Sequence, residues 1–448
     1  MRYDALMRLV ADLHLHSKYS RATSKELDVE GLYRWSKIKG INLIGSADFT
    51  HPLWFAELKR RLEPLGNGLF RLSSTNNFQQ STNNSEPYYI LTSEISSIYS
   101  QGGSVRRIHN VILAPSLETV EKINKELAKR GNLYSDGRPI FGISARDLVA
   151  LLKVIDPAIE IIPAHIWTPW FSLFGSMSGF DSIEECFGDQ AKHIHAIETG
   201  LSSDPEMNWR LSGLDDVAIV SAGDGHSGHN LMREATVFEL PEPSYDNIIG
   251  AIKNSNSVSF RENFRGSAPH IAYTIEFYPE EGKYHWDGHR DHQVRLSPAE
   301  TKKLNGICPK CQRPVTVGVE YRVEQLADRT IEQARDHGRI RRPPFKKLVQ
   351  LEQIIAEAIG KGEATKAVRD RYLAMVEQFG SEFAILNDLS LNQLERTVDP
   401  RIVEGLRRVR EGDISIEPGY DGEYGRVSVF ASHSPAEHTA LTVQPKLL

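Results

Sequence analysis

Two histidines near the start of the chain, His14 and His16, are the first residues whose types and spacing suit chemistry. The stretch 10–15 alternates polar and apolar side chains in the manner of a short strand. Side chains two positions apart in a strand point to the same side, so both imidazoles face one place, as metal ligands do. The alternative is a histidine pair that is solvated on a sheet face or satisfied inside a core.

Several further apolar runs each end in, or carry, a residue that can bind a metal ion. Helical patterns lie between most of these runs, over residues 29–39, 118–130 and 145–153. Functional residues of α/β barrels lie at the C-terminal ends of the parallel strands, so we expect these side chains to converge on one pocket. Histidines and carboxylates suit Zn, Mn or Fe, and two or three neighbouring ions commonly cleave phosphoesters. The residues concerned are Asp48, His51, Glu94, His109, His165, Glu198, Asp224 and His226.

Six motifs in these runs resemble those of the polymerase and histidinol phosphatase (PHP) superfamily. They are Asp-Leu-His-Leu-His-Ser at 12–17, Ala-Asp-Phe-Thr-His at 47–51, Thr-Ser-Glu at 92–94, His-Asn at 109–110, Pro-Ala-His at 163–165 and Gly-Asp-Gly-His-Ser at 223–227. The resemblance implies an α/β fold, namely a distorted barrel of seven β/α units, with a trinuclear metal centre.

Carried over position by position, the resemblance assigns ligands to each metal. The first site would consist of His14, His16, Glu94 and Asp224. Glu94 would also bridge to a second metal, which His109 and His165 complete. The predicted catalytic residues are Glu94, Asp224 and His226.

The third metal site departs most from the family. His226 would hold this metal together with His51 or Asp48, because the usual adjacent Asp-His is spread here over residues 48–51. Residues 21–23 read Arg-Ala-Thr where many PHP proteins place another His or Asp. Which of the two residues ligates stays open at this point.

The composition is that of an ordinary globular protein with room for two or three domains. The chain has 448 residues, 40% hydrophobic and 25% charged. Lys and Arg number 53 against 59 Asp and Glu, a net charge of −6, so positive charge that meets a nucleic acid must be local. Three cysteines favour a reducing compartment over a disulfide framework. Without an apolar run of membrane-spanning length or a signal-peptide pattern in residues 1–10, we expect a cytoplasmic protein.

A pair of histidines and a pair of cysteines predict a structural zinc site. His289 and His292 are followed by Cys308 and Cys311, two pairs with zinc-ribbon spacing. Four protein ligands close the coordination sphere, so this zinc would fold a small module. His285 is an alternative to one of the histidines, and surface histidines beside a cysteine turn are the alternative to the whole site.

Changes in composition predict four parts of the chain. Helical patterns dominate the third part, over residues 327–337, 348–359, 366–378 and 391–397. The parts are the barrel (1–265), the zinc-ribbon module (266–325), a mainly helical DNA-binding domain (326–430) and a flexible tail (431–448).

Two stretches are candidates for binding a substrate. In the first, the aromatic residues Trp167, Trp170 and Phe171 follow a predicted ligand and could stack on a displaced base, unless they cap the barrel core. The second is a basic loop that suits phosphate contacts, with a solvated face as the alternative. Its residues are Arg341, Arg342, Lys346 and Lys347.

Two polar segments complete the prediction. Residues 73–85 are low in complexity and read as a mobile loop of variable length. The last residues, 444–448, resemble a sliding-clamp docking peptide, with a frayed chain end as the alternative.

The full set of motifs narrows the resemblance to the endonuclease Q family. Besides the barrel motifs, it rests on Phe277-Tyr-Pro-Glu-Glu-Gly-Lys-Tyr, Asp287-Gly-His-Arg290 and Pro418-Gly-Tyr-Asp-Gly-Glu-Tyr-Gly425. His292 departs from the pattern, since a cysteine of the zinc module is expected there. The resemblance implies DNA repair by nicking on the 5′ side of hypoxanthine, uracil, xanthine and abasic sites, through in-line attack of a metal-bound hydroxide. It also implies zinc in the structural site and in the active site, with Mg or Mn as the alternative in the latter.

Two other classes of function stay open. A small-molecule phosphatase of the histidinol-phosphate type needs the barrel but has no evident use for the additional domains. A catalytically weak binding partner of a helicase or clamp is disfavoured, because an inactive barrel has no need to keep so many ionisable groups together.

Overall fold

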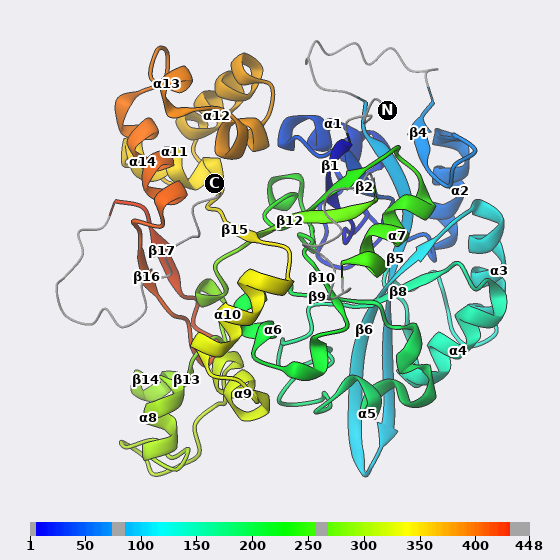
Figure 1. Cartoon of the computed structure of the whole chain (residues 1–448), viewed down its shortest axis with the longest axis horizontal. Coiled ribbons are helices and arrows are strands. Elements are labelled where there is room, and N and C mark those ends of the chain that lie inside the picture. Colours follow the sequence, from blue (N-terminus) through cyan, green and yellow to red (C-terminus); the bar gives the residue numbers. More distant parts are fainter. Residues whose placement is uncertain (1–5, 74–85, 256–267, 431–448) are drawn as a thin grey trace.

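The computed structural model describes residues 6–73, 86–255 and 268–430. Figure 1 shows the barrel on one side and a group of C-terminal helices on the other, with a small module below those helices. The low-complexity stretch, except for residue 73, and the tail lie outside the described residues. Among the described residues, no helix combines the length and the apolar character needed to cross a membrane.

Seven strands surround the predicted metal site in a distorted α/β barrel, as expected. β1, β2 and β5 run parallel, β6 is antiparallel to both β5 and β8, and β9 and β10 form a separate parallel pair. Backbone hydrogen bonds from Ile166 to Glu198 and from His16 to Gly225 join that pair to its neighbours. The strands are β1 (Met7–Asp12), β2 (Leu43–Gly45), β5 (Tyr88–Gln101), β6 (Ser104–Ala114), β8 (Glu160–Pro163), β9 (Ala196–Glu198) and β10 (Ala218–Val220).

Further strands extend the sheet past the predicted barrel boundary. β11 pairs with β1, β12 with β11, and β15 with β12, so the sheet continues past residue 265 and takes an edge strand from the third predicted part. In Figure 1 this edge strand crosses beside β12. The additional strands are β3 (Leu62–Pro64), β4 (Phe70–Leu72), β7 (Ile140–Phe141), β11 (Ala235–Leu240), β12 (His270–Glu276) and β15 (Phe345–Lys347).

The barrel helices begin and end where capping chemistry dictates. The Asp28 side chain caps α1 by accepting a hydrogen bond from the Gly31 N–H, and Gly40 ends this helix with a φ of 86°, which confirms the prediction over residues 29–39. Serines 116, 144 and 244 cap α3, α4 and α7 in the same way. The helices are α1 (Val29–Lys39), α2 (Pro52–Arg61), α3 (Leu117–Leu127), α4 (Ala145–Ile155), α5 (Ile183–Phe187), α6 (Pro205–Trp209) and α7 (Tyr245–Asn254).

The remainder of the chain forms the small module, the C-terminal helices and a hairpin. The module has its own apolar cluster around Val294, Leu296, Cys308 and Val315. Its elements are β13 (Asp287–His289), β14 (Val294–Leu296) and α8 (Pro298–Lys303). The helices are α9 (Val319–Leu326), α10 (Ile331–Arg341), α11 (Leu351–Ile359), α12 (Lys366–Phe379), α13 (Leu391–Leu394) and α14 (Pro400–Glu411), and the hairpin is β16 (Ser415–Glu417) with β17 (Arg426–Ser428).

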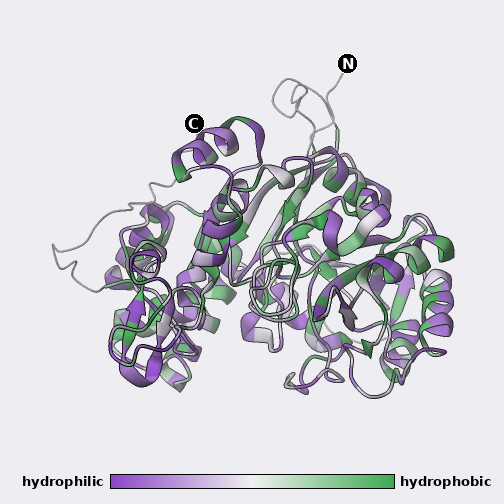
Figure 2. Ribbon diagram, turned by 90° about the horizontal axis from the view of Figure 1, so that it is seen from below, coloured by the Kyte–Doolittle hydropathy of each residue, from purple (hydrophilic) through white to green (hydrophobic). Residues whose placement is uncertain are grey.

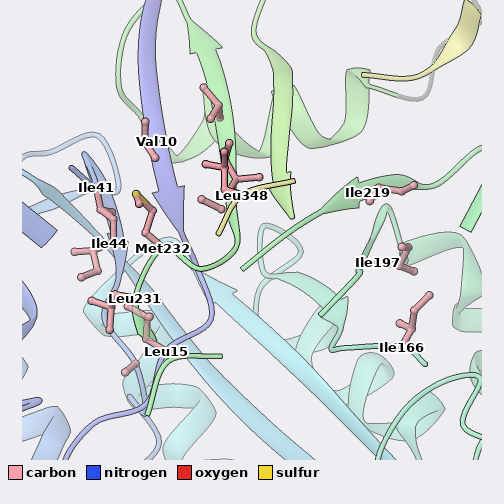
Figure 3. Packing of buried hydrophobic residues seen from close by; sticks show 14 of the residues in the cluster. Val10, Leu15, Ile41, Ile44, Ile166, Ile197, Ile219, Leu231, Met232 and Leu348 are labelled. Atoms are coloured by element: carbon pink, nitrogen blue, oxygen red, sulfur yellow. The ribbon is translucent and has the colours of Figure 1, made fainter. Parts of the chain in front are cut away.

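One continuous apolar core joins the barrel to the C-terminal helices. Figure 3 shows part of it, including Val10 on β1, Ile44 on β2 and Leu348 just before α11. Figure 2 shows apolar residues along the inner strands, while the helices mix both kinds, as expected for helices with one buried face. The buried Lys39 ammonium on α1 also lies 2.5 Å from the buried Glu382 carboxylate. The helical part is therefore packed onto the barrel as one body.

Candidate metal centre and cleft

Four side chains place one ligand atom each around a single point. Nε2 of His16 lies 3.1 Å from Oδ1 of Asp224 and 3.3 Å from Oε2 of Glu94. Nε2 of His14 lies 3.5 Å from the same Glu94 oxygen and 3.7 Å from the same Asp224 oxygen. Ligand atoms about 2.1 Å from a tetrahedral ion are roughly 3.4 Å apart, so this spacing suits one divalent metal ion.

The other oxygen of Glu94 belongs to a second group. Oε1 of Glu94 lies 2.5 Å from Nδ1 of His109 and 3.2 Å from Nε2 of His165. The two imidazole nitrogens are 3.3 Å apart. Glu94 therefore contributes one oxygen to each group, which is the arrangement of a bridging carboxylate.

Strained backbone lies within four residues of the ends of three strands and positions the site. Asp48, His165 and Asp224 follow β2, β8 and β10 and have φ angles of 31°, 32° and 46°. Residues with side chains rarely adopt such angles, which cost about 1–3 kcal/mol each and concentrate at functional sites. Gly200, with a φ of 59°, passes so close to His165 that an added Cβ would lie 2.3 Å from the Cβ of that histidine.

Carboxylates behind the ligands fix the orientation of two imidazole rings. Nδ1 of His14 lies 2.9 Å from a Glu198 oxygen, and Nδ1 of His16 lies 3.2 Å from Oδ1 of Asp48. Hydrogen bonds of this kind leave Nε2 free for a metal. The position of Glu198 at the end of an apolar run marked it as a possible ligand, but its supporting contact with His14 could not be predicted from local spacing.

The structure corrects the predicted ligand role of Asp48. Its Oδ2 accepts hydrogen bonds from the Ser17 N–H at 2.7 Å, the Ser17 hydroxyl at 2.7 Å and the Ser20 hydroxyl at 2.8 Å. Together with the bond to His16, these contacts use both oxygens. Asp48 therefore supports a ligand instead of being one.

His51 and His226 also lie apart from the two ligand groups. The His51 ring stacks on Tyr19 with the ring centroids 4.3 Å apart. Nδ1 of His226 lies 2.9 Å from the Asp224 carbonyl oxygen, to which it can donate. Within residues 6–73, 86–255 and 268–430, neither histidine joins a group of three ligand atoms, so the expected third site is not assembled.

The electrostatic surroundings in the site favour the metal-binding forms of Glu94 and His109, but they favour a protonated His14, whose proton a bound metal ion would displace. Burial acts to raise the pKa of Glu94, but His109, Arg138 and His14 lower it well below its usual value. Burial lowers the pKa of His109 to about 4, which keeps this imidazole neutral at pH 7. Burial also acts to lower the pKa of His14, yet the surrounding carboxylates raise it well above its usual value.

Buried polar atoms without partners show that the residues suit a bound cation. Nε2 of His14, Nε2 of His16 and Oδ1 of Asp224 are buried and make no hydrogen bond among the described residues. Leaving such atoms unpaired costs about 1–3 kcal/mol each. A divalent ion between them would satisfy all three, and this donor set suits Zn, Mn or Fe.

A cleft of about 930 Å³ opens beside the two groups. His109, His165 and Asp224 lie on its barrel side, and residues 277–285 with Tyr424 form the opposite wall. Its positive side chains are Arg107, Arg138, Arg233 and Lys283, and its aromatic side chains are Trp170, Phe171, Phe277, Tyr284 and Tyr424. Positive charge with aromatic faces suits a single strand of nucleic acid.

The predicted aromatic residues divide between the cleft and the core. Trp170 and Phe171 line the cleft. Trp167 is only 1% exposed, and its indole N–H donates to Asn208 at 2.8 Å, so this residue belongs to the core. The predicted substrate-binding role of Trp167 is therefore wrong.

The predicted basic loop is mostly structural. The buried Arg342 donates to the carbonyl oxygens of Val217 and Leu214, and the buried Lys347 lies 2.8 Å from Asp204. Lys346 donates to Asn387 at 2.6 Å. Arg342 and Lys347 thus attach this loop to the barrel, and Lys346 attaches it to the C-terminal helical part, which corrects the phosphate-binding role predicted for the three residues. Arg341 is the exposed member of the set.

The predicted zinc ligands meet in the small module. His289, His292 and Cys311 have ligand atoms within 4.8 Å of one another, and Nδ1 of the two histidines is 3.3 Å apart. Cys308 is buried beside Cys311 in the same apolar cluster. His285 lies elsewhere, since it lines the cleft.

Comparison with known proteins gives a match to one family and to two relatives. Residues 350–413 match the MJ0043 C-terminal domain. The uncharacterized protein MJ0043 of Methanocaldococcus jannaschii is 33% identical over 271 residues, which are 59% of this chain but only 31% of that protein. The chain therefore spans about a third of the length of this relative. The uncharacterized protein YqxK of Bacillus subtilis is 25% identical, over 94% of this chain and all of that protein.

Two solved structures match almost the whole chain. The lesion-specific endonuclease PfuEndoQ from Pyrococcus furiosus has a TM-score of 0.79 and 29% identity, covering 94% of this chain and 95% of that chain. Endonuclease Q in complex with a 27-mer duplex substrate, which has an abasic lesion at the active site, has a TM-score of 0.77 and 29% identity, covering 94% and 96%. The agreement extends over the barrel, the small module and the C-terminal helices, so this chain is similar to endonuclease Q over almost its whole length.

Proposed function

We propose that this chain is a DNA repair endonuclease that hydrolyses the phosphodiester on the 5′ side of hypoxanthine, uracil, xanthine and abasic sites. The observation that carries the proposal is the bridging carboxylate of Glu94, which gives one oxygen to each of two ligand groups beside a cleft of about 930 Å³. The likeness to endonuclease Q over 94% of the chain supports the choice of DNA as the substrate.

The metal ions would be held by His14, His16, Glu94 and Asp224 on one side and by Glu94, His109 and His165 on the other. Bound there, zinc would supply Lewis-acid activation of water and of the scissile phosphate, with magnesium or manganese as the alternative. The remaining steps depend on the side chains of the protein itself.

Three side chains prepare the centre for this chemistry. Glu94 fixes the separation of the two groups, and Glu198 orients the His14 ring through a hydrogen bond of 2.9 Å. Burial lowers the pKa of His226, so this ring beside Asp224 stays neutral and can accept a proton.

The aromatic side chains of the cleft would hold a base outside the duplex. Trp170 meets Tyr284 edge to face with the ring centroids 5.7 Å apart, and Phe171 lies against His109 at 4.7 Å. A mispaired or missing base costs less to extrude than a paired one, which contributes to the selection of lesions. Trp170 and Phe171 are therefore the candidates for contact with the lesion.

We also propose that a structural zinc ion is held by His289, His292, Cys308 and Cys311. The observed proximity of three of these side chains, together with the burial of Cys308, supports this closed ligand set. The zinc would stabilise a module whose apolar cluster is too small to fold alone.

A nicking assay tests the proposed function. Duplexes with one hypoxanthine, uracil or abasic site, and an undamaged control, are end-labelled and incubated with Mg or Mn or with a chelator. We expect metal-dependent cuts directly 5′ of the lesion, and Glu94→Gln should lower the rate by about 10²-fold or more. The exposed Glu377→Gln on α12 serves as the matched control.

The alternatives give different results. Release of phosphate from a small phosphoester, without cleavage of DNA, would point to the phosphatase. Inactivity toward both substrates, together with binding to DNA, a helicase or a clamp, would point to a binding protein.

A further inference from the structure

Arg138 lies at the junction of the two ligand groups and the cleft. Its guanidinium Nη1 lies 3.0 Å from Oε2 of Glu94, the oxygen that also faces His14 and His16. Arg138 also lines the cleft, and its side chain is 26% exposed. This arginine therefore touches both the predicted metal ligands and the space where a substrate would lie.

The loop that carries Arg138 is held firmly on both sides. The Gly137 N–H donates to the Tyr19 carbonyl oxygen at 3.1 Å, and the Gly137 carbonyl oxygen accepts from the Thr50 hydroxyl at 3.2 Å. An added Cβ at Gly137 would lie 2.3 Å from Oδ2 of Asp48, so the loop passes directly against the residue that supports His16. On the other side, the Pro139 carbonyl oxygen accepts from the Ser96 N–H at 3.0 Å. The guanidinium is thus delivered to the site from a fixed backbone.

Most donors of this guanidinium remain available. A guanidinium has five N–H donors in a planar fork, which suits bidentate contacts with phosphate oxygens. Among the described residues, the one acceptor within hydrogen-bond distance of the Arg138 side chain is Glu94. The unused donors belong to a side chain that lines the cleft.

The other two arginines of the cleft are engaged differently. Nε of Arg233 donates to the Gly223 carbonyl oxygen at 2.8 Å, which ties down the loop after β10. The Arg107 guanidinium lies over the Phe171 ring, 5.5 Å from its centroid. Neither has a hydrogen bond to a ligand side chain in the described parts of the chain, so Arg138 is distinct among the three.

We propose that Arg138 is a catalytic residue that holds the scissile phosphate: one N–H stays on Glu94, and the remaining donors bind a non-bridging oxygen of the phosphodiester. The inference rests on the proposed function, since it assigns a role within the same site. A fixed cation at this place stabilises the additional charge of the transition state at no cost in reorganisation. Loss of one such donor typically costs about 10²–10³-fold in rate.

The test compares Arg138→Ala and Arg138→Lys with the control Arg369→Ala, an exposed arginine on α12, all as full-length protein. For Arg138→Ala we expect kcat for lesion nicking to fall about 10²-fold or more, with bound metal unchanged by elemental analysis. Arg138→Lys should recover only part of the rate, because an ammonium group lacks the planar fork. Added ethylguanidinium should restore activity to Arg138→Ala and should leave the activity of Arg369→Ala unchanged.

A second readout does not depend on activity. With the metals removed by chelator, Arg138→Ala should bind a short lesion-containing duplex about tenfold more weakly than the unaltered protein. Loss of metal from Arg138→Ala would overturn the proposal, since the arginine would then act only through Glu94. Unchanged kcat and unchanged affinity would overturn it as well. If the unaltered protein cuts no lesion, the proposed function is wrong, and the metal-free binding comparison alone decides the role of Arg138.

Discussion

The Glu198 carboxylate, at the end of β9, lies 2.9 Å from Nδ1 of His14, while Nε2 of the same ring faces Glu94 and Asp224. The carboxylate thereby determines which nitrogen carries the proton and which one is free to bind a metal.

Replacing Glu198 with Gln should weaken the first metal group without unfolding the barrel. Removal of a supporting acceptor typically lowers metal affinity or activity about 10–100-fold. Metal titration followed by nicking measures both quantities. The control is Glu160→Gln, which alters the similar pair of Glu160 and His195, 2.7 Å apart. Glu160 lies at the start of β8, whereas His165 follows the other end of this strand. Equal effects of the two substitutions on metal affinity would contradict the role of Glu198.

Replacing Cys311 with Ala should remove one zinc equivalent and loosen the small module. A structural zinc ion contributes directly to the folding of its domain, so residues 287–315 should become sensitive to protease. Elemental analysis and limited proteolysis measure these changes. The third cysteine, Cys186, is buried in the barrel core, and Cys186→Ala should keep the zinc. Full zinc content in Cys311→Ala would exclude this residue as a ligand.

Replacing Lys39 with Met should destabilise the whole protein. The Lys39 ammonium is buried 2.5 Å from Glu382, whose carboxylate also accepts a hydrogen bond from the Tyr372 hydroxyl at 2.6 Å. An unpaired buried carboxylate costs about 3–5 kcal/mol of the free energy of unfolding. The control is Lys59→Met, which breaks the exposed pair with Glu121 and should cost less than about 1 kcal/mol. Urea denaturation compares the two variants. Similar losses in the free energy of unfolding would contradict a larger contribution of the buried pair to stability.

Replacing Glu281 with Gln should change how stability depends on pH. Burial raises the pKa of Glu281 to about 8, and the nearby Glu363, Glu280 and Glu357 add to the effect. The folded state therefore binds more protons than the unfolded state, whose glutamate pKa is about 4.3. The free energy of unfolding must then fall as the pH rises from about 4.3 to about 8.

In Glu281→Gln this loss is absent. The free energy of unfolding of the variant should therefore be about 2–4 kcal/mol larger than that of the unaltered protein above pH 8, and equal to it near pH 4. Urea denaturation over a pH series measures the difference. The exposed Glu377→Gln should follow the unaltered protein at every pH. A constant offset between Glu281→Gln and the unaltered protein would contradict the raised pKa.

The sequence by itself determined the features that depend on local spacing and on strand ends. The alternation around His14 and His16 predicted two imidazoles on one side of a strand. β1 ends at Asp12, before both histidines, yet their Nε2 atoms do face a common point. The apolar runs before Glu94, His165 and Asp224 predicted strands that deliver their ligands to one place, because parallel strands of a barrel end on the same face. Helix α1 could be predicted to the residue, since Asp28 and Gly40 are local capping signals.

Only the tertiary structure decided which of the candidate residues act directly. The sequence makes Asp48 and His51 equally good candidates for a metal ligand. In the fold, the Ser17 and Ser20 hydroxyls donate hydrogen bonds to Asp48, so its carboxylate is already occupied. Trp167 and Trp170 differ by three positions, yet one packs in the core and the other lines the cleft.

The same holds for contacts between residues far apart in the chain. The sequence of the basic loop before α11 predicts phosphate contacts. In the structure, β15 pairs with β12, and Lys347 is buried beside Asp204. The sequence does not show the partners of Glu198 and Arg138, because His14 follows β1 and Glu94 lies on β5. Such pairings depend on how the chain closes the barrel over long separations, and no local pattern of residue types encodes that.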